Sequence, residues 1–240
     1  SSNTTMETEL PEMFRRRSEV HPDERYTFHS SRMRMKHVTP EELARMNADS
    51  TRCVAELVDA ECDALAYACL VAIMSQGEQA YCTEGVRIAD AVAENGGHAS
   101  VVTSAGALIT GLEALGAKRV GMITPYVPSL TETVVNCVQS ADIEVVDKVS
   151  LGVSDNLEVG RLDPTNLKEV AAGLNLKGCD ALIVSACVQM PSLPMVAEIE
   201  RMVGIPTLSA ATATVFELLR ALGRSTDVPE AGHLLSGAVA

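Results

Sequence analysis

Two cysteines, Cys69 and Cys187, end similar apolar stretches of this 240-residue sequence. One stretch starts at Cys62 and the other at Cys179, and both open with Cys-Asp-Ala-Leu and close with Ala-Cys. A thiolate can act as a nucleophile, and a thiol can give up a proton during catalysis. A single cysteine in an apolar stretch is more often an inert core residue, but the repeated placement favours a chemical role for this pair.

The stretch around Cys187 predicts a buried strand followed by a helix. Residues 181–184 form a short apolar run with β-branched members, and the prolines at 191 and 194 suit a first helical turn. Cys187 would then lie at the carboxyl end of a strand and face a helix N-terminus, which is where open α/β sheets bind ligands. Helix N-termini favour anions, so we expect a substrate carboxylate there and a lowered pKa for the cysteine thiols.

A second repeat supports a doubled chain. A Ser-Ala pair, at Ser104 and again at Ser209, precedes an Ala-Leu-Gly sequence in both places. Internal similarity of this kind sets the architecture of a fold. We therefore predict two related halves that face each other, each contributing one cysteine to the cleft between them.

The predicted fold class is α/β, with two similar flavodoxin-like (Rossmann-like) halves, mostly parallel sheets and a pseudo-twofold relation between the halves. Residues 1–103 and 211–240 are predicted to form the first half, which carries Cys69. Residues 104–210 are predicted to form the second half, which carries Cys187. The active site is expected in the cleft between them.

Strands and helices are predicted to alternate along the chain, which favours parallel sheets. The predicted strands cover residues 26–31, 62–69, 99–103, 118–124, 143–147, 181–184 and 206–209. The predicted helices begin near residues 6 and 163 and also cover 39–60 with an interruption near 49–50, 84–95, 107–116, 129–140, 193–203 and 211–222.

Three polar residues lie where such elements meet. Asn3 belongs to a Ser-Asn-Thr run ahead of a helix, which is typical of helix capping but could also hold a carboxylate. Tyr126 follows the strand at 118–124, so its ring lies either near the cysteines or against solvent with its hydroxyl exposed. Asn156 lies in a loop of turn residues.

The composition excludes several classes of protein. The net charge of −13 argues against binding to nucleic acid or to an anionic membrane, and 3% aromatic residues with no tryptophan leave no base-stacking platform. No stretch is long and apolar enough to span a membrane. Seven cysteines without a CxxC motif, and five histidines without zinc spacing, predict neither a disulfide framework nor a zinc site. We expect reduced thiols in a cytoplasmic protein.

Four strings of residues resemble those of a known family. They are residues 1–9 (SSNTTMETE), 29–36 (HSSRMRMK), 67–74 (YACLVAIM) and 185–190 (SACVQM). Over nearly its whole length the chain is similar to maleate cis-trans isomerases of the aspartate/glutamate racemase superfamily. Family members begin with a strand ahead of the first string that this sequence does not show, and the segment 76–85 also differs from them.

The resemblance implies a cofactor-free enzyme that converts maleate to fumarate, with Cys69 as nucleophile and Cys187 as proton donor, and we assign no residue as a metal ligand. It further implies a homodimer and a place in nicotinate degradation. It assigns binding of the substrate carboxylates to side chains and main-chain groups at Asn3, Leu70, Val71, Tyr126, Asn156, Val188 and Gln189.

Two thiols suit this reaction. Addition of the Cys69 thiolate to the alkene would make the central bond single, with electron density held as an enediolate. Rotation and expulsion of the thiolate would give fumarate, and Cys187 could donate and retrieve a proton. Two facing cysteines could equally serve a racemase or decarboxylase of the same superfamily, and a non-catalytic small-anion binding protein is a third hypothesis.

Overall fold

The structure is a computed structural model that describes residues 3–35 and 39–239, so Ser1, Ser2 and Lys36 of the family-like strings lie outside the described residues. Helices and strands alternate through most of the chain. The helices are α1 (Met6–Arg17), α2 (Pro40–Ala48), α3 (Ser50–Val58), α4 (Leu70–Met74), α5 (Ala80–Glu94), α6 (Ser104–Ala114), α7 (Pro128–Gln139), α8 (Asn156–Val159), α9 (Leu167–Gly173), α10 (Leu193–Val203) and α11 (Ala210–Ala221), with short 3₁₀ turns at Pro164–Asn166 and His233–Leu235.

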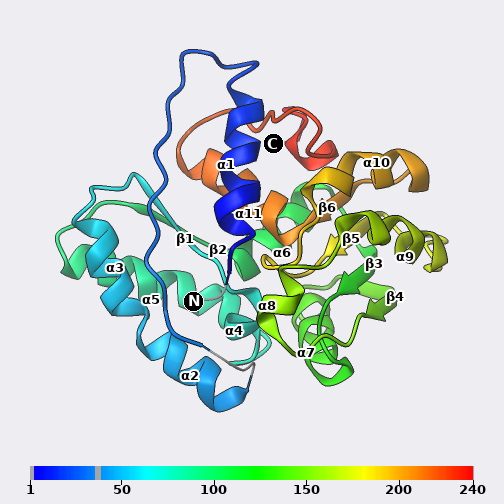
Figure 1. The fold of residues 1–240 in the computed structure, drawn as a ribbon, viewed down its shortest axis with the longest axis horizontal. Coiled ribbons are helices and arrows are strands. Elements are labelled where there is room, and N and C mark those ends of the chain that lie inside the picture. The colour runs from blue at the N-terminus through cyan, green and yellow to red at the C-terminus, as the bar shows by residue number, and fades with distance from the viewer. Residues whose placement is uncertain (1–2, 36–38, 240) are drawn as a thin grey trace.

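Within the described residues, six strands form two parallel sheets that lie on opposite sides of the molecule (Figure 1). The strands are β1 (Ala64–Tyr67), β2 (Ser100–Thr103), β3 (Arg119–Thr124), β4 (Glu144–Ser150), β5 (Ala181–Ser185) and β6 (Thr207–Ser209). One sheet pairs β1 with β2, and the other has the order β4-β3-β5-β6. The predicted α/β class with parallel sheets is therefore confirmed.

Strand β5 is the most deeply buried element of the larger sheet. All five of its residues are buried, because β3 and β6 pair with its two edges and helices cover both faces of the sheet. A strand buried on both faces must be apolar throughout rather than alternating, which is why the Ala-Leu-Ile-Val run at residues 181–184 predicted it correctly.

Helices α1, α4 and α8 lie between the two sheets, whereas α6 and α11 pack against each other (Figure 1). Helix α11 also contacts β1, β2 and β6 and so touches strands of both sheets. Strands β1 and β2 fall within residues 1–103 and strands β3 to β6 within 104–210, but the boundary between two halves and their pseudo-twofold relation stay predictions. Among the described residues, no helix combines the length and the apolar character needed to cross a membrane.

The predicted strand at residues 26–31 is wrong. This segment is extended but pairs with no other described strand. Its alternation has another cause: the rings of Tyr26 and Phe28 pack on Phe14 of α1 at centroid distances of 4.5 and 5.5 Å, while Ser30 and Ser31 point to carboxylates. A two-residue alternation of apolar and polar side chains indicates only that one side of the segment is covered by other residues. It does not require a neighbouring strand.

The predicted strand at 62–69 is shorter than expected, since β1 covers Ala64–Tyr67, two predicted helix starts are displaced, and one helix was missed. Helix α5 begins at Ala80 instead of residue 84, and α6 begins at Ser104 directly after β2 instead of residue 107. The short helix α4 was not predicted, because its five residues follow Cys69 without a polar cap or a proline to mark the start. The interruption predicted near 49–50 is confirmed by the break between α2 and α3.

Candidate active site

A cavity of about 930 Å³ opens between α1, the extended segment 25–33, strand β1 and the loop after β5. Both predicted cysteines line it. So do all the other residues predicted from the sequence to bind substrate, which are Asn3, Leu70, Val71, Tyr126, Asn156, Val188 and Gln189. The structure therefore brings together side chains that lie up to 186 positions apart in the chain, from Asn3 to Gln189.

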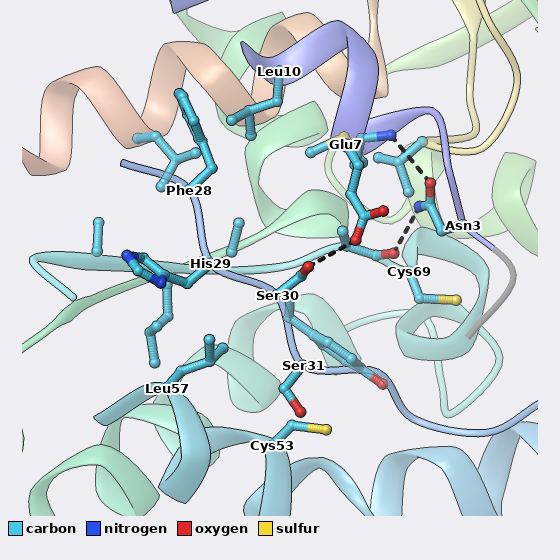
Figure 2. Close-up of a pocket in the computed structure, with 18 of the residues that line it drawn as sticks. Asn3, Glu7, Leu10, Phe28, His29, Ser30, Ser31, Cys53, Leu57 and Cys69 are labelled. Atoms are coloured by element: carbon cyan, nitrogen blue, oxygen red, sulfur yellow. Dashed lines mark hydrogen bonds between the residues drawn. The ribbon is translucent and has the colours of Figure 1, made fainter. Parts of the chain in front are cut away.

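Cys69 occupies the position directly before α4, two residues beyond the end of β1. Figure 2 shows its sulfur beside Asn3 at one end of the cavity. Burial raises the pKa of Cys69 to about 11, the nearby Cys187 raises it too, and the backbone N–H of Ala72 lowers it. The expected lowering by helix N-termini is wrong for this thiol, because desolvation of the thiolate outweighs one amide of a five-residue helix.

Cys187 lies in the loop that leaves β5 and is only 5% exposed. The hydroxyl of Ser185 donates to the Cys187 carbonyl at 2.9 Å, and the backbone N–H of Gln189 points to the Cys187 sulfur at 3.4 Å. Burial raises the pKa of Cys187, whereas the Tyr126 hydroxyl and the N–H groups of Gln189 and Met190 lower it. The net direction is upward, so this cysteine too is a neutral thiol at neutral pH.

Tyr126 follows β3 by two residues and is buried. Its hydroxyl hydrogen-bonds to Cys187, and burial, together with the proximity of Cys187 and Cys69, raises the pKa of Tyr126 well above its ordinary value. The alternative expectation of a hydroxyl in solvent is therefore wrong. Tyr126 stays protonated and presents a neutral donor between the two thiols.

Asn3 connects the start of α1 to the Cys69 segment. Its side-chain oxygen accepts from the Met6 N–H at 3.1 Å, and its amide nitrogen donates to the Ala68 carbonyl at 3.4 Å (Figure 2). The side chain thus binds the first amide of α1 and also lines the cavity, and its binding of a substrate carboxylate stays a prediction.

Gln189 joins three segments at the cavity. Its side-chain oxygen accepts from the Thr4 N–H at 2.9 Å, and its side-chain nitrogen donates to the Asn156 carbonyl at 3.0 Å. Its own carbonyl accepts from the Thr5 hydroxyl at 2.6 Å. The side chain packs so closely that a Cβ at Gly160 would lie 2.5 Å from its nitrogen, so Gln189 has one well-defined position.

Sequence reasoning did not single out Thr4, Thr5 or Glu9. All three lie in a polar run that is fully explained, on sequence grounds, as the beginning of a helix. Only the folded chain shows that Thr4 and Thr5 bond to Gln189 and that Glu9 reaches the loop after Cys187. No local pattern carries that information, because the partners are more than 180 residues away.

The lining of the cavity suits a small anion held by neutral groups. Its donors include the Asn3 amide, the Tyr126 hydroxyl and the first amides of α4, which lack partners inside the helix. Within residues 3–35 and 39–239, no group of three or more histidine, cysteine, aspartate or glutamate side chains comes together as a set of metal ligands. Four cysteines, Cys53, Cys62, Cys69 and Cys187, line the cavity, and Cys69 and Cys187 are the two that lie near Tyr126.

The sequence of this chain matches that of a known class of enzymes. The sequence model of the arylmalonate decarboxylase family matches residues 20–235 of this chain. An arylmalonate decarboxylase of Bordetella bronchiseptica is 27% identical, although only over half of the chain.

Maleate isomerases are much more similar. That of Geobacillus stearothermophilus is 53% identical over 99% of this chain and 94% of its own length. A crystal structure of a cysteine-to-alanine variant of the maleate isomerase of Pseudomonas putida S16 with maleate superposes with a TM-score of 0.97 at 50% identity, covering 100% of this chain and 95% of that one. The chain therefore belongs to the maleate isomerases, as the four strings of the sequence indicated.

One further structure bears on the chemistry. A cysteine-to-serine variant of the maleate cis-trans isomerase of Nocardia farcinica, which carries a covalently bound succinylcysteine intermediate, superposes with a TM-score of 0.94 at 45% identity. That match covers 98% of this chain and 95% of the other.

Proposed function

We propose that this protein isomerises maleate to fumarate without a cofactor, with Cys69 as nucleophile and Cys187 as acid and base. The observation that carries the proposal is that Cys69 and Cys187, which follow strands of different sheets, line a single cavity beside the neutral hydroxyl of Tyr126. Membership of the maleate isomerases supports the substrate, and the succinylcysteine of the Nocardia relative supports covalent catalysis by a cysteine.

The first step is addition of the Cys69 thiolate to one alkene carbon of maleate. The sulfur forms a bond to that carbon, and the electron pair of the double bond moves onto the neighbouring carbon and its carboxylate as an enediolate. Because burial keeps the Cys69 thiol neutral in the free protein, its proton must leave to solvent before addition. A thiolate of high pKa is intrinsically the stronger nucleophile once it forms.

The second step uses Cys187. Its thiol protonates the enediolate carbon to give a succinyl-cysteine at Cys69, and the resulting Cys187 thiolate is stabilised by the Tyr126 hydroxyl and the Gln189 N–H. Rotation about the new single bond then becomes possible. Cys187 takes the proton back, the carbon–sulfur bond to Cys69 breaks, and fumarate leaves.

The two carboxylates are held by neutral donors. We assign one to the amides of Leu70 and Val71 with Asn3, and the other to the segment of Val188 and Gln189 with Asn156. The hydroxyl of Tyr126 lies between the thiols, where it can stabilise developing negative charge as an oxyanion hole does. Donors fixed in position before the reaction are worth more than mobile water, because no reorganisation is needed.

A decarboxylase or racemase activity is the second candidate. The match to the arylmalonate decarboxylase family favours it, and two facing thiols can also move a proton at a carbon next to a carboxylate. Such an enzyme would exchange that carbon-bound hydrogen for deuterium or release carbon dioxide, and would leave maleate unchanged.

Proton NMR of maleate incubated with reduced protein and EDTA separates the two candidates. We expect the maleate signal to be replaced by that of fumarate, and the Cys69→Ala variant to be inactive. Folded protein that leaves maleate untouched would refute the isomerase, and a Cys69→Ala variant with near-normal turnover would refute the assigned nucleophile.

A further inference from the structure

Glu9 is a buried carboxylate that connects α1 to the beginning of α10. Its side chain is 6% exposed, and one oxygen accepts from the backbone N–H groups of Ser192 and Leu193 at 2.6 and 2.8 Å. These two amides belong to the N-terminus of α10, an 11-residue helix whose first N–H groups have no partner within the helix. Burial raises the pKa of Glu9, while the same two amides lower it.

Glu9 connects two segments of the chain, and each of them leads to residues that line the cavity. On its own segment, Asn3 caps α1 and contacts the Cys69 strand through Ala68. On the other side, Ser192 and Leu193 end the loop that carries Cys187. Glu9 therefore spans the gap between the element that holds Asn3 and the element that holds the proton-donating thiol.

Other contacts restrain the same loop closer to Cys187. Ser185 bonds to the Cys187 carbonyl, and the Thr5 hydroxyl bonds to the Gln189 carbonyl at 2.6 Å. Glu9 adds the hydrogen bonds at the end of this loop, where Ser192 and Leu193 lead into α10. Burying a carboxylate is costly unless hydrogen-bond donors compensate for the lost water, so the contacts of Glu9 are not those of an ordinary surface side chain.

We propose that Glu9 is a positioning residue that fixes the Cys187 loop against α1, and thereby sets the distance of the Cys187 thiol from Asn3 and Cys69. This role rests on the proposed isomerisation for its effect on turnover, but its effect on Cys187 is independent of any substrate. The second oxygen of Glu9 has no partner among the described residues. A glutamine can therefore keep the accepting oxygen and place its NH₂ group where the unpartnered oxygen lies.

The variants Glu9→Ala, Glu9→Asp and Glu9→Gln test this role, and Glu200→Ala is the matched control. Glu200 also accepts from two backbone N–H groups, those of Thr207 at 2.8 Å and His233 at 2.9 Å, but lies toward the opposite end of α10 and does not line the cavity. Each variant is first checked for folding by circular dichroism. Two quantities are then measured: kcat/KM for maleate, and the rates at which iodoacetamide alkylates Cys187 and Cys69 in the absence of substrate.

We expect Glu9→Ala and Glu9→Asp to lower kcat/KM roughly 10- to 100-fold, since misplacement of a reacting group by about 1 Å has effects of that size. Cys187 should be alkylated several-fold faster in both, with the rate at Cys69 changed less than twofold. Glu9→Gln should restore both values to near wild type, and Glu200→Ala should leave them unchanged.

A folded Glu9→Asp variant with wild-type kcat/KM and wild-type Cys187 alkylation would overturn the proposal, even if Glu9→Ala fails to fold. So would a Glu9→Gln variant as impaired as Glu9→Asp, because the charge rather than the accepted hydrogen bonds would then matter. If the wild-type protein leaves maleate unchanged, the proposed function fails, whereas the alkylation rates still decide the role of Glu9.

Discussion

Raising the pH should accelerate alkylation of Cys69 about tenfold per unit from pH 7 to pH 10. The thiolate is the reactive form, and burial raises the pKa of Cys69 to about 11. Below that pKa the thiolate fraction grows tenfold with each unit of pH. At pH 8, three units below the pKa, about one thiol in a thousand is ionised, compared with roughly one in four for an unperturbed cysteine of pKa 8.5.

The experiment compares Cys69 with Cys82, which is the exposed cysteine of the described chain. Iodoacetamide is added at half-unit steps of pH between 7 and 11, and the modified peptides are quantified by mass spectrometry. Modification of Cys82 checks that the reagent stays active over this range, and we expect the rate at Cys69 to keep rising to about pH 11. A Cys187→Ser variant should move the Cys69 profile to lower pH, because the charge of Cys187 contributes to the rise.

A Cys69 profile that levels off at or below pH 8.5 would refute this reasoning. The N-terminus of α4 would then dominate over burial, and the thiolate would already be present in the free enzyme at neutral pH. The same comparison applies to turnover: kcat/KM for maleate should rise with pH over the range in which Cys69 ionises in the free enzyme.

Three further predictions concern the surroundings of the site. Gly160→Ala should lower kcat/KM several-fold, because the new Cβ would lie 2.5 Å from the Gln189 nitrogen, while Gly173→Ala, with open space around it, should have no effect in the same assay. Tyr126→Phe removes the hydroxyl that lowers the pKa of Cys187, so the pH profile of Cys187 alkylation should move to higher pH. We also expect kcat to fall roughly tenfold or more. An unchanged pH profile would contradict the hydrogen bond between Tyr126 and Cys187. Arg17→Met should lower the free energy of unfolding, measured in urea, by about 3 kcal/mol. The reason is that the fully buried side chain of Arg17 pairs with Glu24 at 2.7 Å and with Asp227 at 3.1 Å. Arg201→Met, which removes an exposed ion pair with Glu230, should change this free energy far less.

The main features of the fold were predictable because they depend on short-range patterns. The apolar run at 181–184 and the prolines in the first turns of two helices, Pro128 and Pro194, predict strands and helices from a few neighbouring residues. Alternation of such elements then implies parallel strands, whose carboxyl ends lie at the same edge of a sheet. Cys69 and Cys187 follow strands of different sheets, so their meeting at one cavity depends on how the two sheets face each other.

The strand predicted at 26–31 shows the limit of such patterns. Side-chain alternation is local, but a strand exists only where a second chain segment supplies hydrogen bonds. In the structure this segment packs its rings on α1 and pairs with no described strand. The five-residue helix α4 was missed for a related reason, since its length leaves too few residues for a helical period to be recognised.

The sequence by itself determined which cysteines to consider, because the two repeated stretches end at Cys69 and Cys187, and their catalytic roles stay a proposal. Only the tertiary structure decided the pKa values of the two thiols and which residues hold them in position. The pKa of Cys69 rises because distant parts of the chain exclude water from it, and this burial is not visible in the residues next to it. In the sequence Glu9 is an ordinary acidic residue in the first turn of a helix. In the folded chain it accepts hydrogen bonds from the backbone N–H groups of Ser192 and Leu193, which are 183 and 184 residues away.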